Sequence, residues 1–410
     1  MADKDAHYEA PWTENLRHRP DPNRVQPLVD GGHAAISAPP WQSSPQSPPG
    51  VSLEPRRAHA SPQSETGSES EPSYYDVSPL KRPVWKWQIA NYFYFGGMSA
   101  GAYLIARAAD RAGRGRHRAV ARTGVWVALA ALAPCPPLLI DDLGDPKRFH
   151  HMLRVFKPAS PMNLGTWMLT GYGGALAAAA ARELLRDFGL APEEAPPPAG
   201  EAAKTWLDAH DLAGIPLATT VAGYTGVLLS CTANPLWCKN RWLGPLFSAS
   251  AVSTGAEAIS LALDLSRREE REEQDASQRV LQKIDSAAHV AEAVCITGFR
   301  REAGEKGKSL EQGPVSKVHR FATGALIASE VLKRLPVKGK WRKPVRMLAA
   351  ASGLAAGFAL RWAMVYGGKQ AADDPHTARL VSRPQRGELA GDEARSSLRV
   401  SAASGATEQR

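Results

Sequence analysis

The sequence has few of the residues that hold a metal or a cluster. Its 410 residues include only four cysteines. They form no CxxC pair and show no zinc or iron–sulfur spacing: Cys135, Cys231, Cys238 and Cys295. We therefore expect no metal site and no iron–sulfur cluster in this chain. Cys231 and Cys238 are close enough to suggest a disulfide, but we interpret them as small apolar side chains.

Histidines placed to bind a haem are also scarce. A haem b needs histidines deep in neighbouring helices. Only His289 lies deep within an apolar run, whereas His319 lies near the end of one and His150 and His151 follow one. This placement argues against a haem held by two histidines.

The chain lacks the basic face that a nucleic-acid-binding domain requires. Its formal net charge is +9, but Lys and Arg gather in short segments between apolar runs, which is the pattern of membrane proteins. We expect no nucleic-acid partner. The opening segment MADKDAHYEAPWTENL has no apolar core of a secretory signal, so we expect the first apolar run to direct membrane insertion.

Composition divides the chain into three parts. Residues 1–83 are rich in Pro, Ser and charged residues and have almost no apolar clusters, which predicts a disordered polar tail. Residues 377–410 have a similar composition and predict a second disordered tail. Residues 84–376 contain the apolar runs and form the predicted membrane domain. Within that domain, residues 191–204 are expected to be a loop.

The apolar runs are about 18 to 22 residues long, which is enough to cross a bilayer. Two of the runs, 282–299 and 317–335, are short and contain ionisable residues, so hydropathy alone supports six spans and two amphipathic helices. The sequence thus predicts an all-α, multi-pass protein of the cell membrane. The eight candidate spans are 87–107, 120–140, 162–182, 212–232, 245–265, 282–299, 317–335 and 346–367.

Lys and Arg are densest in alternate loops, after the runs 87–107, 245–265 and 317–335. The last of these basic loops includes Lys333 and Arg334. The positive-inside bias assigns these loops to the cytoplasm and both termini to the outside.

Ionisable groups inside spans are costly and usually face a bundle interior or a water-filled cavity. Asp285, His289 and Glu292 follow one another at i, i+4 and i+7, so they share one face of a helix. This stripe fits a proton path, and it also fits a helix that is partly in water or paired with another helix. For Glu257 and Glu330, we expect an ion pair with Arg361.

The stretch LLIDDLGDPKRFHHMLRVFKP ends an apolar run on two acids, Asp141 and Asp142. Asp145 and Pro146 then begin a short amphipathic helix that we expect to lie in the membrane interface. At this boundary Asp142 could take a proton from a lipid-soluble donor and release it to water. It could equally cap the helix or pair with Arg148.

Several segments together resemble the NrfD family, the integral membrane subunits of polysulfide reductases and formate-dependent nitrite reductases. DLGDPKRF is followed by MLRVFKPASPMNLGTWML, and the other motifs come in the family's order. They are VWKWQIANYFYFGGMSAGAYLIA (84–106), YTGVLLSCTANPLWCKNRWLGPLFSASAVSTGAEA (224–258) and LRWAMVYGGKQAADDP (360–375).

The resemblance implies eight transmembrane helices built as two four-helix bundles. It further implies electron exchange between menaquinol or menaquinone and a partner iron–sulfur subunit, with no haem or cluster in this chain. The expected partners are a four-cluster ferredoxin-like subunit and a catalytic subunit that contains molybdopterin.

By position in the motifs, the resemblance assigns Asp142 to proton exchange. It also assigns Asn91, Tyr92, Tyr94 and Tyr224 to the quinone site. Two alternatives stay open at this point. One is a proton or ion transporter that uses Asp285, His289 and Glu292, and the other is a structural anchor without a quinone site.

Overall fold

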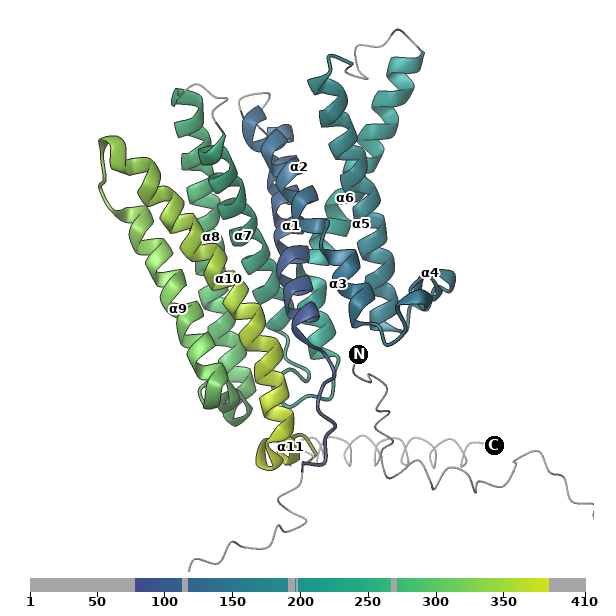
Figure 1. Ribbon diagram of the computed structural model, residues 1–410, viewed down its shortest axis with the longest axis vertical. Coiled ribbons are helices and arrows are strands. Elements are labelled where there is room, and N and C mark those ends of the chain that lie inside the picture. The colour runs from purple at the N-terminus through teal and green to yellow at the C-terminus, as the bar shows by residue number, and fades with distance from the viewer. Residues whose placement is uncertain (1–77, 113–116, 191–195, 197, 267–270, 383–410) are drawn as a thin grey trace, which may run out of the picture. The chain divides into compact units, whose positions relative to one another are not determined.

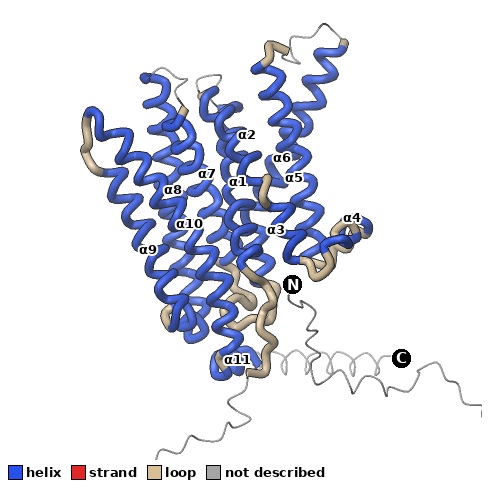
Figure 2. Tube along the Cα trace, in the orientation of Figure 1, coloured by secondary structure: helices blue, strands red, loops and turns tan. Residues whose placement is uncertain are grey.

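A computed structural model describes residues 78–112, 117–190, 196, 198–266 and 271–382. All regular structure in these residues is helical (Figures 1 and 2). The predicted tails 1–83 and 377–410 lie largely outside the described residues. The α-helices are α1 (Trp87–Ala112), α2 (Arg118–Leu132), α3 (Cys135–Asp142), α4 (His151–Arg154), α5 (Pro161–Asp187), α6 (Ala199–Ser230), α7 (Leu243–Leu265), α8 (Arg271–Ala303), α9 (Gly313–Arg334), α10 (Arg342–Asp373) and α11 (Pro375–Ser382). Short 3₁₀ turns are η4 (Pro146–Arg148), η6 (Gly304–Leu310) and η7 (Gly339–Trp341).

The second predicted span is interrupted. The apolar run 120–140 was expected to form one helix, but α2 ends at Leu132 and α3 begins at Cys135. Pro134, Pro136 and Pro137 lack the backbone N–H that would continue the hydrogen-bond ladder, and a proline ring clashes with the preceding turn. The break frees α3 to take its own direction.

Other boundaries also differ from expectation. Helix α6 begins at Ala199, so residues 199–204 are helical and not part of a loop. Four helical segments of the described residues are long and apolar enough to cross a membrane: Arg118–Asp142, Ala199–Ser230, Leu243–Leu265 and Gly339–Asp373. Helix α5 does not belong to this set, although its span was expected to be clearly apolar.

The long helices pack side by side (Figure 1). Helix α1 packs on α2 and α6 and also on α7 and α10, and α6 packs on α7. Small residues allow the closest approach. A Cβ at Gly101 would overlap the backbone of Ala251, and a Cβ at Gly255 would overlap the backbone around Ala102.

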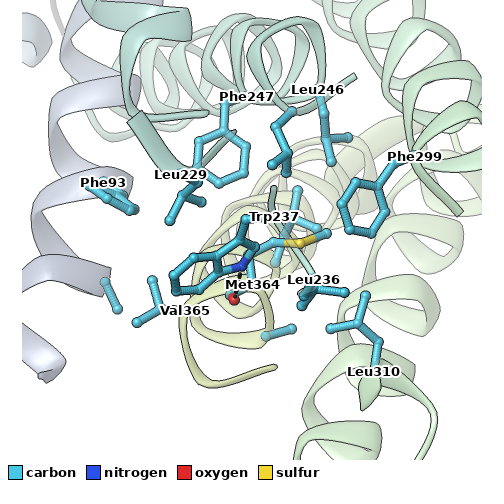
Figure 3. Packing of buried hydrophobic residues seen from close by; sticks show 14 of the residues in the cluster. Phe93, Leu229, Leu236, Trp237, Leu246, Phe247, Phe299, Leu310, Met364 and Val365 are labelled. Carbon is cyan, nitrogen blue, oxygen red and sulfur yellow. Dashed lines mark hydrogen bonds between the residues drawn. The ribbon is translucent and has the colours of Figure 1, made fainter. Parts of the chain in front are cut away.

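The middle of the connection between α6 and α7 is buried, and its Leu236 and Trp237 form part of the core (Figure 3). Trp237 is 1% exposed, and its indole Nε1 donates a hydrogen bond to the carbonyl oxygen of Met364 at 3.0 Å. Trp85, which precedes α1, stacks on the Trp237 ring with centroids 5.5 Å apart. Asn234 Nδ2 donates to the carbonyl oxygen of Gly368 at 2.8 Å. These contacts tie the ends of α1, α6 and α10 together.

Candidate functional site

A cavity of about 380 Å³ lies beside α3, bordered by α1, α2, α4, α5 and α6. Most of its lining is apolar, and the polar groups that border it are few. Such a cavity suits a largely apolar ligand that carries a few polar atoms. The polar lining residues are Asp142, Tyr92, Tyr224, Thr166 and Thr170, and the apolar ones include Trp85, Ile89, Phe93, Leu132, Leu139, Met152 and Leu169.

Asp142 is the last residue of α3 and borders the cavity. The chain turns to an extended conformation at Leu143, so the carboxylate lies where the helix stops. The positive charges of Lys86 and Lys369 act on it, and the backbone N–H of Lys86 hydrogen-bonds to it. An ion pair with Arg148 was the alternative role expected for Asp142. This expectation is wrong, because Arg148 pairs with Asp145 at 3.0 Å.

Asp141 has a separate role that the sequence did not indicate. Its Oδ2 accepts a hydrogen bond from Nε2 of Gln88, a buried residue of α1, at 2.7 Å. Asp141 is not among the cavity residues. The two adjacent acids therefore have different contacts: Asp141 holds α3 to α1, and Asp142 borders the cavity.

The expected quinone residues separate into two groups. Tyr92 and Tyr224 border the cavity, whereas Asn91 and Tyr94 do not. Asn91 Nδ2 donates to the carbonyl oxygen of Trp87 in its own helix. Tyr94 packs edge-on against Phe358 of α10, with ring centroids 5.2 Å apart. Residues two apart in a helix differ by about 200° around its axis, so Tyr92 and Tyr94 face opposite sides of α1.

Tyr224 is held in place by α5. Its hydroxyl donates a hydrogen bond to the carbonyl oxygen of Pro161, and its ring lies against Gly165. Any side chain at Gly165 would overlap the ring. The first turn of α5 therefore sets the position of the phenol at the cavity wall.

The segment after Asp145 forms two short turns where the sequence predicted one amphipathic helix. Asp145 does cap the first turn, because its Oδ1 accepts the N–H of Lys147 at 3.2 Å. Asn163, a residue that sequence reasoning passed over, holds the second turn. Its Nδ2 donates to the carbonyl oxygens of Met152 and Val155, at 2.9 and 3.0 Å. Phe149, Met152 and Leu153 of this segment line the cavity.

A second constellation lies among α7, α8 and α9. The structure brings Asp285 and His289 together with Glu257, and the atoms that could bind a ligand lie within 4.8 Å of one another. His289 Nε2 is 3.4 Å from Asp285 Oδ1 and 3.5 Å from Glu257 Oε1. His289 Nδ1 is 2.8 Å from Glu330 Oε1.

Lys333 lies at the centre of this cluster. Its Nζ pairs with Asp285, is 3.0 Å from Glu330 Oε1 and is 3.6 Å from Glu257 Oε1. The sequence had placed Lys333 in a basic loop, but its side chain is 7% exposed and turns into the helices. An ammonium group there supplies the positive charge that a metal ion would otherwise bring to these donors.

Arg361 is not the partner of Glu257 or Glu330, which corrects the expected ion pairs. Its guanidinium donates to Ser250 Oγ and to the carbonyl oxygen of Phe247, and it stacks over the Phe247 ring at 4.7 Å. Glu292 is the acid near Arg361, and its carboxylate hydrogen-bonds to Ser250. The helical stripe of Asp285, His289 and Glu292 thus reaches from Lys333 to Arg361.

The model of the polysulphide reductase, NrfD, family matches residues 77–372. The chain belongs to the NrfD family. NrfD proteins are integral membrane subunits of respiratory oxidoreductase complexes, in which they work with iron–sulfur and catalytic subunits. A search of the curated proteins finds no match to the chain.

Proposed function

We propose that this NrfD protein exchanges electrons between menaquinol or menaquinone and a partner iron–sulfur subunit, and that the cavity beside α3 is its quinone site. The observation that carries the proposal is the meeting of Asp142, Tyr92 and Tyr224 at one largely apolar cavity of about 380 Å³. That volume lies within the range of about 300–1,000 Å³ that is usual for small-molecule sites.

The residues present fit such a ligand. Apolar walls suit the ring system, and the Tyr92 phenol and the Asp142 carboxylate suit its oxygens. The Tyr224 hydroxyl donates to Pro161, so it can accept a hydrogen bond from a quinol hydroxyl. A bound menaquinol supplies two electrons and two protons. Asp142, at the end of α3, accepts these two protons one after the other and passes each to water, while Lys86 and Lys369 stabilise the carboxylate between transfers. Tyr92 and Tyr224 orient the ring.

The packing of the long helices supports a bilayer arrangement. We propose that eight segments cross the cell membrane, namely α1, α2 with α3, and α5 to α10, as two four-helix bundles. Helices α8 and α9 join them although they are polar, because their ionisable groups face one another. A four-cluster ferredoxin-like subunit would receive the electrons, and a molybdopterin subunit would complete the chemistry.

The test compares Asp142→Asn with Asp141→Asn in the purified complex, with a menaquinol analogue as donor. We expect Asp142→Asn to lower turnover by about 10²-fold or more, because the proton acceptor is lost. Asp141→Asn keeps an acceptor for Gln88 and should retain turnover. If turnover and analogue binding are unchanged in Asp142→Asn, the assigned role is wrong.

Proton transport is the second candidate function. The buried cluster of Asp285, His289, Lys333 and their neighbours favours it, because such groups are costly inside a membrane. Proton uptake by the isolated chain in liposomes, without a redox partner, would support transport as the main activity. Absence of any quinone from the active complex would instead support a structural anchor.

A further inference from the structure

Lys333 is the buried ammonium at the centre of the ionic cluster. Carboxylates approach its Nζ from three helices: Glu257 from α7, Asp285 from α8 and Glu330 from α9 itself. The fourth helix, α10, contributes Gly353, where any side chain would overlap the Glu257 carboxylate. The packing of the four helices therefore places these carboxylates close to one ammonium group.

The cluster has one carboxylate more than its permanent cations neutralise. In the described residues it holds four acids, Glu257, Asp285, Glu292 and Glu330. The cations that face them are Lys333, Arg334 and Arg361, where Arg334 is 2.9 Å from Glu330. One further proton, on His289 or on a carboxyl group, balances the charge. The burial of Glu257 Oε2 without a hydrogen-bond partner leaves an oxygen that can accept a proton.

Polar side chains continue from the cluster toward the end of the bundle where α7 ends and α10 begins. A small cavity of about 10 Å³ borders Glu257, Asp285 and Lys333, and it is also lined by Ser260, Gln282 and Arg346. A space of this size holds about one water. Arg346 pairs with Asp264 at the end of α7 and lies 3.8 Å from Asp275 of α8, which in turn pairs with the exposed Arg342.

Lys333 is the second-last residue of α9, so its flexible side chain starts near the end of the bundle that carries this polar route. The α9–α10 connection at the same end includes the exposed residues Lys338 and Lys340. A lysine side chain has several rotatable bonds and can change partners without moving the helix.

We propose that Lys333 carries protons between the water at the α9–α10 end and the buried carboxylates Asp285 and Glu257. In the inward step an N–H bond of the ammonium breaks and an O–H bond forms on Asp285, which leaves a neutral amine and a neutral carboxyl group. The amine then takes a proton from a hydronium ion through the small cavity, and water is left. One proton has entered the cluster, and no oxidation or reduction is involved.

Together with the proposed quinone chemistry, on which this inference rests, the cluster becomes a proton store fed from the face opposite Asp142. Asp142 is the last residue of α3 and lies beside the start of α1. Lys333 lies near the other end of the bundle, where α7 connects to α8 and α9 connects to α10 (Figure 1). Quinol oxidation and proton uptake would then occur at different faces of the membrane.

The decisive comparison is Lys333→Arg against the wild type and against Lys338→Met. Arginine keeps the positive charge that the carboxylates need but does not give up its proton. The complex is placed in liposomes with a menaquinol analogue and the acceptor of its catalytic subunit, and a pH-sensitive dye reports proton movement. We expect Lys333→Arg to lose proton uptake by about tenfold or more, with analogue binding retained. Lys338→Met should behave as the wild type.

A second variant guards against misfolding of Lys333→Arg. The double variant Lys333→Met/Asp285→Asn removes one charge of each sign. The net charge of the cluster is therefore kept, while the proton-carrying amine is lost. Both variants should show the same deficit. Undiminished proton uptake in either folded variant would overturn the proposal, and so would a wild-type complex that turns over without proton uptake. The quinone proposal is judged separately by Asp142→Asn.

Discussion

Gln88 of α1 donates a hydrogen bond to Asp141 of α3 at 2.7 Å, and this bond places the next residue, Asp142, at the cavity. The contact joins two segments that are 53 positions apart in the sequence. Since α3 is separated from α2 by a proline break, it depends on such contacts for its position.

Gln88→Ala should loosen α3 without touching the ligand directly. Loss of a hydrogen bond to a carboxylate costs about 1.5–3 kcal/mol when the carboxylate is dry and less when it is exposed, as Asp141 is. We expect weaker binding of a menaquinol analogue, measured by titration of the complex. The matched control is Asn91→Ala, one turn away and outside the cavity lining. Equal binding in both variants would contradict the positioning role of Gln88.

Gly165→Ala should displace Tyr224, because the added methyl group would overlap the tyrosine ring. Overpacking of this kind typically costs about 1–3 kcal/mol. Thermal unfolding can be followed with a thiol-reactive dye that reports exposure of the buried Cys135 and Cys295. Gly174→Ala in the same helix is the control, since a Cβ there meets no atom within 4 Å. A variant as stable as this control would show that α5 and Tyr224 are not in tight contact.

Gly353→Ala should disturb the ionic cluster from the α10 side. The methyl group would occupy the place of the Glu257 carboxylate and push it away from Ser329, whose hydroxyl donates to it at 3.3 Å. We expect lower thermal stability and reduced proton uptake together, with binding of a menaquinol analogue unchanged. Gly324→Ala in α9 is the control because a Cβ there is in open space. Normal proton uptake would argue against the cluster as a proton store.

We expect the attachment of α11 to depend on pH through the carboxyl group of Asp374. Partial burial alone would raise the pKa of its carboxyl group, but hydrogen bonds from Thr377 and from the backbone N–H of His376 hold the pKa below its usual value. A lowered folded-state pKa contributes stability above the unfolded-state pKa, and this stability is lost as pH falls through the folded-state value.

Hydrogen exchange of Pro375–Ser382 should therefore quicken in acid relative to neutral pH, after correction for the intrinsic exchange rate. Asp374→Asn keeps a capping oxygen but has no charge to lose, so its corrected exchange should vary less with pH. Equal pH dependence in the two proteins would remove Asp374 as the cause.

The sequence indicated the family and the segments that border the candidate site, but it did not determine which residues of a helix face the cavity. The motif around Asp142 and the tyrosines of 84–106 could be recognised from the order of their residues alone. Which tyrosine borders the cavity depends on the rotation of α1, and the Tyr94 contact with Phe358 is made by a residue far along the chain. The proline run Pro134–Pro137 did carry a signal for the break in the second span.

The ionic cluster shows the same division. Helical spacing alone placed Asp285, His289 and Glu292 on one face, because the period of the α-helix is fixed by its backbone. Glu330 and Lys333 are three apart, and this spacing indicates that their side chains are neighbours on one helix face.

What the sequence by itself determined is the helical, membrane-embedded character of the chain and its family, since these follow from apolar length, local periodicity and motif order. What only the tertiary structure decided is which charges meet. Lys333 turns inward and Arg361 binds Ser250, because a buried charge takes the partner that packing places nearest, and packing joins residues on different helices.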